Sequence, residues 1–373
     1  MADSASTPNH VAVIGASGVI GQAVTRHFAT RSAWSVTAIS RRTPLNCPGA
    51  GFLGLDLLDP EACRRAVATL GDVTHLVYCA VQERPGLVGG WHEQSHVDTN
   101  AAMLRNLLEP MLPTARRLRH VILLQGTKAY GAHVEPIPSP ARESWPRHQH
   151  RNFYFDQEDY VRAKSEGADW DWTILRPQVV FGDAIGANMN PMLALAVYGS
   201  ILAEQGRPLD FPGGPHFGLA EATDARLIAQ ACQWAFECPS SANETFNLTN
   251  GDVFSWRGIW PTIAASLGME VGADTPASLA EMLPVFRPAW TEIVQRYHLR
   301  VPAHVDAFVG QSLTYTDLLI RLSSGIAGPS VLLSTIKVRQ AGFERCIDTE
   351  DMFRNWFDTM RAERLLPPLR TGR

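Results

Sequence analysis

The stretch His10-Val-Ala-Val-Ile-Gly15-Ala-Ser-Gly18-Val-Ile-Gly21 decides the fold of this chain. Residues 10–14 are rich in β-branched side chains, which suit a buried parallel strand. The glycines that follow allow a tight turn, and residues 22–29 can form a helix. A strand, a glycine-rich turn and a helix in this order form the unit that binds a dinucleotide pyrophosphate at the helix N-terminus.

The glycine spacing is GxxGxxG, which resembles that of short-chain dehydrogenases. Downstream, strand and helix signals alternate, with further strands expected at 34–40, 54–57, 75–80, 120–125 and 171–182. This alternation predicts an α/β fold with a doubly wound parallel sheet of the Rossmann type. We expect an NADP-binding domain at residues 1–182 and a mostly helical substrate-binding part at 183–373, with segments around 220–250 returning to the sheet.

Composition excludes several classes of protein. The formal net charge of the 373 residues is -4, so the chain lacks the excess of basic residues that is typical of proteins that bind nucleic acids or anionic membranes. The six cysteines are scattered without a CxxC pair, which favours reduced thiols. Residues 1–9 lack the apolar core of a signal peptide, and the apolar run 191–203 is too short to span a bilayer. We therefore expect a cytoplasmic protein with a small-molecule substrate, and leave open whether it forms a homodimer.

The end of the second strand predicts the cofactor. An NAD-specific site has Asp or Glu about 20 residues past the glycines, where it binds the ribose hydroxyls. Here the residues are Ser40-Arg41-Arg42, and two guanidiniums with a hydroxyl suit a 2′-phosphate. We expect NADP(H); the alternative is a solvated arginine pair at a strand end. The residues expected to bind the cofactor are Gly15, Ser17, Gly18, Val19, Ile20, Gly21, Ser40, Arg41, Arg42, Asp56, Leu57, Cys79, Ala80, Gln125, Lys128, Tyr154, Pro177, Val179, Val180 and Met189.

A literal zinc-protease signature, HExxH, occurs at His92-Glu93-Gln-Ser-His96. Zinc chemistry would need both histidines on one helical face, a third ligand downstream, and the glutamate as base. No HxxGxxH extension follows, and the next residues belong to a helix of the nucleotide domain. We interpret the match as chance and predict no metal site.

Two tyrosines compete for the catalytic role of a short-chain dehydrogenase, which needs a phenol that donates to the substrate oxygen and a nearby lysine. Tyr160 and Lys164 match the usual YxxxK motif, whereas Tyr154 has Glu158 at the fourth position. However, Tyr154 lies 22 residues before Arg176, the spacing found in atypical relatives whose unit ends in a WTILRP strand. We therefore favour Tyr154, with its lysine supplied from elsewhere.

Two segments resemble motifs of the progesterone 5β-reductase and iridoid synthase family (PRISE). Leu124-Gln-Gly-Thr-Lys128-Ala-Tyr130-Gly131 is similar to LQTGxKHYxGP, and Asn152-Phe-Tyr154-Phe-Asp-Gln-Glu158-Asp159 is similar to NFYYxxED. The resemblance extends over nearly the whole chain, through Asn188-Met189-Asn190 with Tyr198 and the segment 337–367. It implies that Lys128 is the displaced lysine and Tyr154 the catalytic tyrosine.

The chain also departs from these motifs. The lysine loop is one residue shorter between Gln125 and Lys128, and Ala129 stands where the family has His. Phe155 replaces the second tyrosine of NFYY, which leaves one tyrosine in that motif. These changes are compatible with the chemistry and leave the substrate open.

The resemblance implies an NADPH-dependent reductase that transfers hydride to the β-carbon of an α,β-unsaturated carbonyl compound, an apolar enone or enal of steroid-like or terpenoid-like type. Tyr154 would stabilise the enolate oxygen. Two alternatives remain open. One is a carbonyl reductase or a sugar-nucleotide dehydrogenase or epimerase of the extended short-chain dehydrogenase type. The other is a non-catalytic NADP sensor on the same scaffold.

Overall fold

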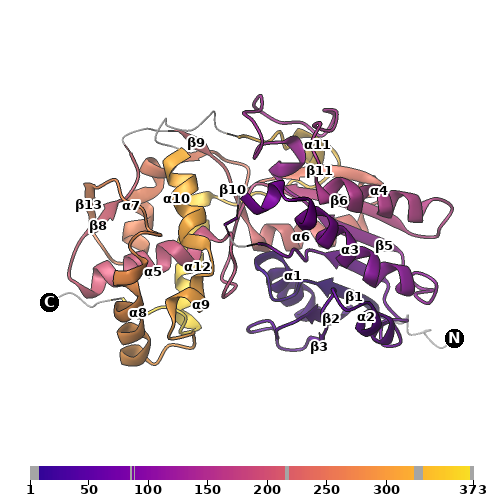
Figure 1. Ribbon diagram of the computed structural model, residues 1–373, viewed down its shortest axis with the longest axis horizontal. Helices are drawn as coiled ribbons and strands as arrows, with labels where there is room; N and C mark the ends of the chain where they lie inside the picture. Colours follow the sequence, from indigo (N-terminus) through magenta and orange to yellow (C-terminus); the bar gives the residue numbers. More distant parts are fainter. Residues whose placement is uncertain (1–7, 85, 88, 215–217, 323–330, 370–373) are drawn as a thin grey trace.

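The computed structural model describes residues 8–84, 86–87, 89–214, 218–322 and 331–369. Its centre is a seven-stranded sheet in the order β11-β6-β5-β4-β1-β2-β3, and all neighbouring strands in it are parallel (Figure 1). This order confirms the predicted doubly wound Rossmann fold. The strands are β1 (Asn9–Ile14), β2 (Trp34–Ser40), β3 (Gly51–Gly54), β4 (His75–Tyr78), β5 (His120–Leu124), β6 (Asp171–Pro177) and β11 (Glu244–Leu248).

Helices cover both faces of the sheet, so its central strands are apolar on both sides. In β1, Val11 and Val13 pack towards one face, and Ala12 and Ile14 towards the other. The first face is covered by α1 (Val19–Ala29) and α6 (Ala225–Glu237), and the second by α2 (Pro60–Val67), α3 (Gln94–Met111) and α4 (Phe153–Ser165).

The C-terminal part builds a second core from helices, on the left in Figure 1. Helix α5 (Pro191–Glu204), buried from Pro191 to Leu202, runs through it, and buried aromatic residues such as Trp260, Trp290 and Phe353 belong to the same core. The other helices here are α7 (Trp256–Ser266), α8 (Leu283–Tyr297), α9 (Val305–Val309), α10 (Ser312–Leu322) and α12 (Thr349–Ala362), while α11 (Ile336–Gln340) lies beside β11.

Short two-stranded sheets lie outside the central sheet. They are β7–β10 (Val179–Phe181 with Ala222–Asp224), β9–β12 (Leu219–Ala220 with Phe254–Ser255) and β8–β13 (Leu209–Phe211 with Val271–Asp274). The described residues also form the short 3₁₀ helices η1 (Gly89–His92), η2 (Thr127–Tyr130) and η3 (Pro239–Ser241). Within the described residues, no helix is both long and apolar enough to cross a bilayer.

The strands expected at 75–80 and 120–125 end slightly earlier, at Tyr78 and Leu124, and two other predicted strands differ more. The third strand, expected at 54–57, ends at Gly54, because the Asp56 side chain accepts a hydrogen bond from Leu58 N and turns the chain into α2. The strand expected at 171–182 is interrupted at Gln178, whose N–H donates to Thr223 Oγ1 and to Leu248 O. After this break the chain leaves the main sheet as β7 and pairs with β10.

Candidate active site

The glycine-rich turn brings backbone against backbone at the carboxyl end of the sheet. Gly15 has a φ of +86°, and a Cβ there would lie 2.8 Å from Ala80 Cα, so only glycine fits. A Cβ on Gly21 would lie 2.2 Å from Gly15 O, so Gly21 lets α1 pack closely against the turn.

The N-terminus of α1 is suited to a phosphate group. Its N-cap is Gly18, no side chain caps the helix, and no acidic residue stands in its first turn. The first N–H groups of the helix are therefore free to bind an anion, which the helix dipole also favours. A pyrophosphate fits this end of the site.

The residues at the end of β2 carry free positive charge. Ser40 is buried and its Oγ donates to Arg42 O at 2.6 Å, whereas the Arg41 and Arg42 side chains are exposed. Neither guanidinium has a hydrogen-bond or ion-pair partner in the described part of the chain. Both are thus available to a ligand phosphate at the edge of the cavity.

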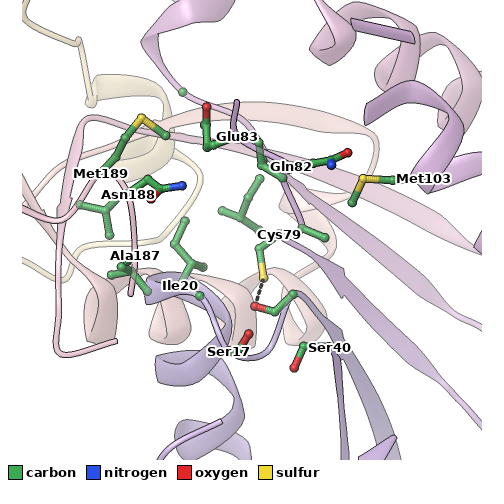
Figure 2. Close-up of a pocket in the computed structure, with 18 of the residues that line it drawn as sticks. Ser17, Ile20, Ser40, Cys79, Gln82, Glu83, Met103, Ala187, Asn188 and Met189 are labelled. Carbon is green, nitrogen blue, oxygen red and sulfur yellow. Dashed lines mark hydrogen bonds between the residues drawn. The ribbon is translucent and has the colours of Figure 1, made fainter. Parts of the chain in front are cut away.

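A cavity of about 480 Å³ runs from these arginines to Tyr154 and Lys128. In Figure 2, Ser17 and Ser40 lie at one end of it, and Glu83 and Met189 at the other. Of the twenty residues expected to bind the cofactor, Gly21 alone does not line this cavity. The residues that do are Gly15, Ser17, Gly18, Val19, Ile20, Ser40, Arg41, Arg42, Asp56, Leu57, Cys79, Ala80, Gln125, Lys128, Tyr154, Pro177, Val179, Val180 and Met189.

Lys128 projects from η2, immediately after β5. Its Nζ donates to Met189 Sδ at 3.6 Å and lies 3.9 Å from the centre of the Trp91 indole. Burial lowers the pKa of Lys128, and the carboxylate of Glu83 opposes this shift. Lys128 is thus an amine held inside the cavity rather than a solvated loop lysine.

Tyr154 lies in the first turn of α4, which begins where Asn152 Oδ1 accepts a hydrogen bond from Tyr154 N. The ring is 7% exposed, and a Cβ built on Gly126 would come 3.8 Å from the phenol oxygen. The hydroxyl therefore faces the loop that carries Lys128. Burial raises the pKa of Tyr154 far above its ordinary value, so the phenol is a neutral hydrogen-bond donor at neutral pH.

The competing pair, Tyr160 and Lys164, lies further along α4 and lines neither this cavity nor the next. Lys164 Nζ is 5.6 Å from the centre of the Tyr160 ring, and burial raises the pKa of Tyr160 to about 12. Tyr160 packs instead against the core beneath α3, near Arg105. The YxxxK match is therefore remote from the cavity.

A second cavity of about 410 Å³ adjoins the first, and the two share the lining residues Thr127, Lys128, Gln178, Val179, Met189 and Tyr315. Its remaining lining is mostly apolar and comes from both parts of the chain. The side chains include Leu87, Trp91, Val134, Leu219, Phe254, Trp256, Leu318 and Leu319. Both its size and its apolar lining are typical of a site for a small apolar ligand.

Sequence reasoning missed three residues of the site: Glu83, Trp91 and Tyr315. Glu83 and Tyr315 line the first cavity, while Trp91 and Tyr315 line the second. Trp91 lies in the short 3₁₀ helix η1, which has no sequence periodicity, and Tyr315 comes from α10, so no local pattern marks either residue. The polar Gln82-Glu83 directly after an apolar strand was the available signal for Glu83.

The HExxH match is divided between two elements. His92 ends η1, whereas His96 lies in α3 and packs against Trp91 and Phe153. Glu93, the N-cap residue of α3, pairs instead with Arg84 at 3.0 Å. Among the described residues, no group of three or more His, Cys, Asp or Glu side chains is arranged to hold a metal ion.

A family model described as a PRISE-like Rossmann-fold domain matches residues 54–367. The chain belongs to the PRISE family. This confirms the resemblance drawn from the two motifs around Lys128 and Tyr154, and makes the chain an oxidoreductase of the short-chain dehydrogenase type.

Three relatives illustrate the breadth of PRISE proteins. The chain is 29% identical to the 3-oxo-Delta(4,5)-steroid 5-beta-reductase of Arabidopsis thaliana, over 95% of this chain and 92% of that protein. It is 30% identical to the short chain dehydrogenase gsfE of Penicillium aethiopicum, over 96% and 100%. It is 28% identical to the (S)-8-oxocitronellyl enol synthase ISY1 of Nepeta cataria, over 95% and 92%.

Solved structures extend the likeness of this PRISE protein in fold alone. A UDP-glucose 4-epimerase superimposes with a TM-score of 0.66 at 16% identity, over 95% of this chain and 98% of that one. The WbmH enzyme of Bordetella bronchiseptica, solved in complex with NAD+, gives 0.63 at 14% identity, over 95% and 99%. The fold is thus that of the extended short-chain dehydrogenases.

Proposed function

We propose that this PRISE-family protein uses NADPH to reduce the C=C bond of an α,β-unsaturated carbonyl compound. The observation that carries the proposal is that Lys128 lines both the first cavity and the apolar one beside it, while Tyr154 lines the first cavity. Two of the relatives are named as a steroid 5-beta-reductase and an oxocitronellyl enol synthase, which supports this substrate class.

NADPH is proposed as the cofactor because the free guanidiniums of Arg41 and Arg42 suit the 2′-phosphate. The uncapped N-terminus of α1 suits the pyrophosphate. In this cavity the cofactor would supply the hydride, and the protein supplies position and electric field. Lys128, Tyr154 and Met189 would then surround the reacting end.

Tyr154 donates a hydrogen bond to the carbonyl oxygen of the substrate and stabilises the negative charge that develops there as the β-carbon accepts hydride. Because burial raises the pKa of its phenol, Tyr154 stays protonated and can act as the hydrogen-bond donor to the enolate oxygen. Lys128 contributes positive charge at the same end of the cavity. The apolar side chains of the second cavity hold the substrate body and exclude water.

Product analysis tests this function. The purified protein is incubated with NADPH and a panel of enones, enals and saturated aldehydes, and the products are separated and identified by mass. Saturated ketones and aldehydes from the conjugated substrates are the expected result. Alcohols from the same substrates would contradict the proposal and assign carbonyl reduction. Tight NADPH binding without any turnover would favour a non-catalytic sensor.

A further inference from the structure

Trp91 connects three polar groups of the candidate active site. Its Nε1 donates to Glu83 Oε2 at 2.9 Å, and Lys128 Nζ lies over its ring at 3.9 Å from the centre. The Tyr154 ring packs edge-on against it, with ring centres 5.5 Å apart. Trp91 is 3% exposed, and Phe153 and His96 also pack against it. The packing therefore holds the indole ring in place, in contact with Glu83, Lys128 and Tyr154.

Lys128 has no carboxylate within ion-pair distance among the described residues. What surrounds its ammonium is the indole face of Trp91 and the sulfur of Met189. An ammonium above an aromatic face is attracted to the negative charge of the π-system, and more strongly when it is desolvated. A carboxylate that accepts the indole N–H polarises the ring further and strengthens this attraction.

Glu83 supplies this carboxylate, and only one of its two oxygens accepts a hydrogen bond from the described residues. Oε2 accepts from Trp91, while Oε1 is buried without a hydrogen-bond partner in the described part of the chain. Burial raises the pKa of Glu83, and Lys128 lowers it; the reciprocal effect of Glu83 raises the pKa of Lys128. The two charges therefore stabilise one another across the indole.

The other titratable groups that face Lys128 or Glu83 are neutral at neutral pH. Burial raises the pKa values of Tyr154 and Tyr315 well above their ordinary values. Burial lowers the pKa of His133 to about 3 and also lowers that of His96, and Lys128 adds to both shifts. Within this group, Glu83 is the acidic side chain whose effect on Lys128 opposes that of burial.

We propose that Glu83 and Trp91 are positioning residues for Lys128: the Glu83 carboxylate, acting through the Trp91 indole, holds the Lys128 ammonium at the end of the cavity that Tyr154 occupies. This inference rests on the proposed role of Lys128 in the reductase reaction. It adds to the motif residues a carboxylate and an indole from the segment between β4 and α3.

Lysine NMR tests the contact without cofactor or substrate. The chain has three lysines, Lys128, Lys164 and Lys337, so protein labelled with ¹³C at lysine Cε gives three side-chain signals. Lys164→Arg and Lys337→Arg assign two of them, and the third belongs to Lys128. We expect the Lys128 signal to carry an upfield ring-current shift and to titrate at lower pH in Glu83→Gln than in the wild type.

Matched variants separate charge from packing. Glu83→Gln keeps an acceptor oxygen for Trp91 Nε1 and removes the charge, and Trp91→Phe keeps a ring and removes the N–H donor. Glu93→Gln makes the same chemical change at an exposed carboxylate nearby, and should leave the Lys128 titration unchanged. Thermal melting followed by circular dichroism checks that each variant is folded. If the Lys128 titration is the same in Glu83→Gln as in the wild type, the proposal is wrong.

Kinetics then test whether the contact matters for turnover. We expect Glu83→Gln to lower kcat roughly tenfold, because a misplaced reacting group loses rate without losing binding. Its KM and its NADPH dissociation constant should stay unchanged. In a Lys128→Ala background the same substitution should have no further effect, since residues that act through one another are non-additive. Equal losses in both backgrounds would overturn the proposal. A protein that reduces no enone would refute the proposed function, while the NMR titration would still decide the contact.

Discussion

Arg176 Nε donates a hydrogen bond of 2.8 Å to Gln125 Oε1, which ties the end of β6 to the residue after β5. Gln125 Nε2 in turn donates to Tyr154 O at 3.2 Å, and Arg176 Nη2 lies 3.4 Å from Glu158 Oε2. All four residues are buried. This network fixes the first turns of α4 against the sheet, and with them the direction of the Tyr154 ring.

Arg176→Met should therefore destabilise the protein and slow the reaction. Removing one partner of a buried ion pair costs about 3–5 kcal/mol, and the lower end applies because Glu158 keeps Arg147 and Arg162 as partners. Urea denaturation measures the loss. Arg162→Met is the matched control, since Arg162 contacts the same carboxylate from a half-exposed position and should cost below about 1 kcal/mol. Equal losses in the two variants would contradict the role of the buried network.

Tyr154→Phe should lower kcat by about 100-fold or more, because an oxyanion donor is lost from a buried site. NADPH affinity should change little, since the phenol is not part of the phosphate-binding end. Steady-state kinetics and fluorescence titration of NADPH measure the two effects. Tyr160→Phe removes the same hydroxyl from the YxxxK match and should keep wild-type kcat. A large loss in Tyr160→Phe with normal turnover in Tyr154→Phe would reverse the assignment.

The substitution Arg41→Ala with Arg42→Ala should weaken NADPH binding and leave NADH binding unchanged. Hydrogen bonds to charged groups contribute about 1.5–3 kcal/mol each, so affinity for NADPH should fall by at least about tenfold. Calorimetric titration with each cofactor measures this preference. Arg65→Ala, an exposed arginine on α2, is the control. A parallel loss for both cofactors would mean that the arginines do not bind the 2′-phosphate.

Glu221 should make stability pH-dependent. Burial raises its pKa to about 7, although the N–H of Leu333 donates to its carboxylate and opposes the shift. A carboxyl group whose pKa is higher in the folded state favours folding while it is protonated. Its contribution to the free energy of unfolding is therefore complete below about pH 4.5. The contribution decreases as the pH rises to about 7, and the total loss is about 3 kcal/mol.

Denaturation of the wild type and of Glu221→Gln across this pH range measures that contribution. The glutamine keeps an acceptor for Leu333 N and does not titrate. The difference in unfolding free energy between the two proteins should therefore change in favour of the variant as pH rises from 4.5 to 8. A constant difference would show that Glu221 titrates normally.

The glycine turn and the β-branched strands were predictable because their signals are local. Residues 10–21 contain the whole strand, turn and helix start, and Ser40-Arg41-Arg42 directly ends its strand. The helices α5 and α7 have equally local signals, since the side chains of Asn190 and Ser255 cap their N-termini. Lys128 and Tyr154 were predicted from motifs and spacing rather than from any local physical signal.

The residues that sequence reasoning missed depend on tertiary contacts. Trp91 gains its position from packing on Phe153 and from the hydrogen bond to Glu83, neither of which has a periodic signature. Tyr315 reaches both cavities from α10, far along the chain from either motif. The break at Gln178 was equally hidden, because its cause is a pair of partners, Thr223 and Leu248, on later elements.

The seventh strand has a consequence for how the protein is made. β11 pairs with β6 through residues 244–248, after the chain has already built α5 and α6. During translation, the first six strands therefore leave the ribosome while the outer backbone of β6 is still unpaired. An open edge of this kind can recruit another strand, including one from a neighbouring nascent chain. The outer backbone of β6 can be fully paired only when residue 248 has emerged.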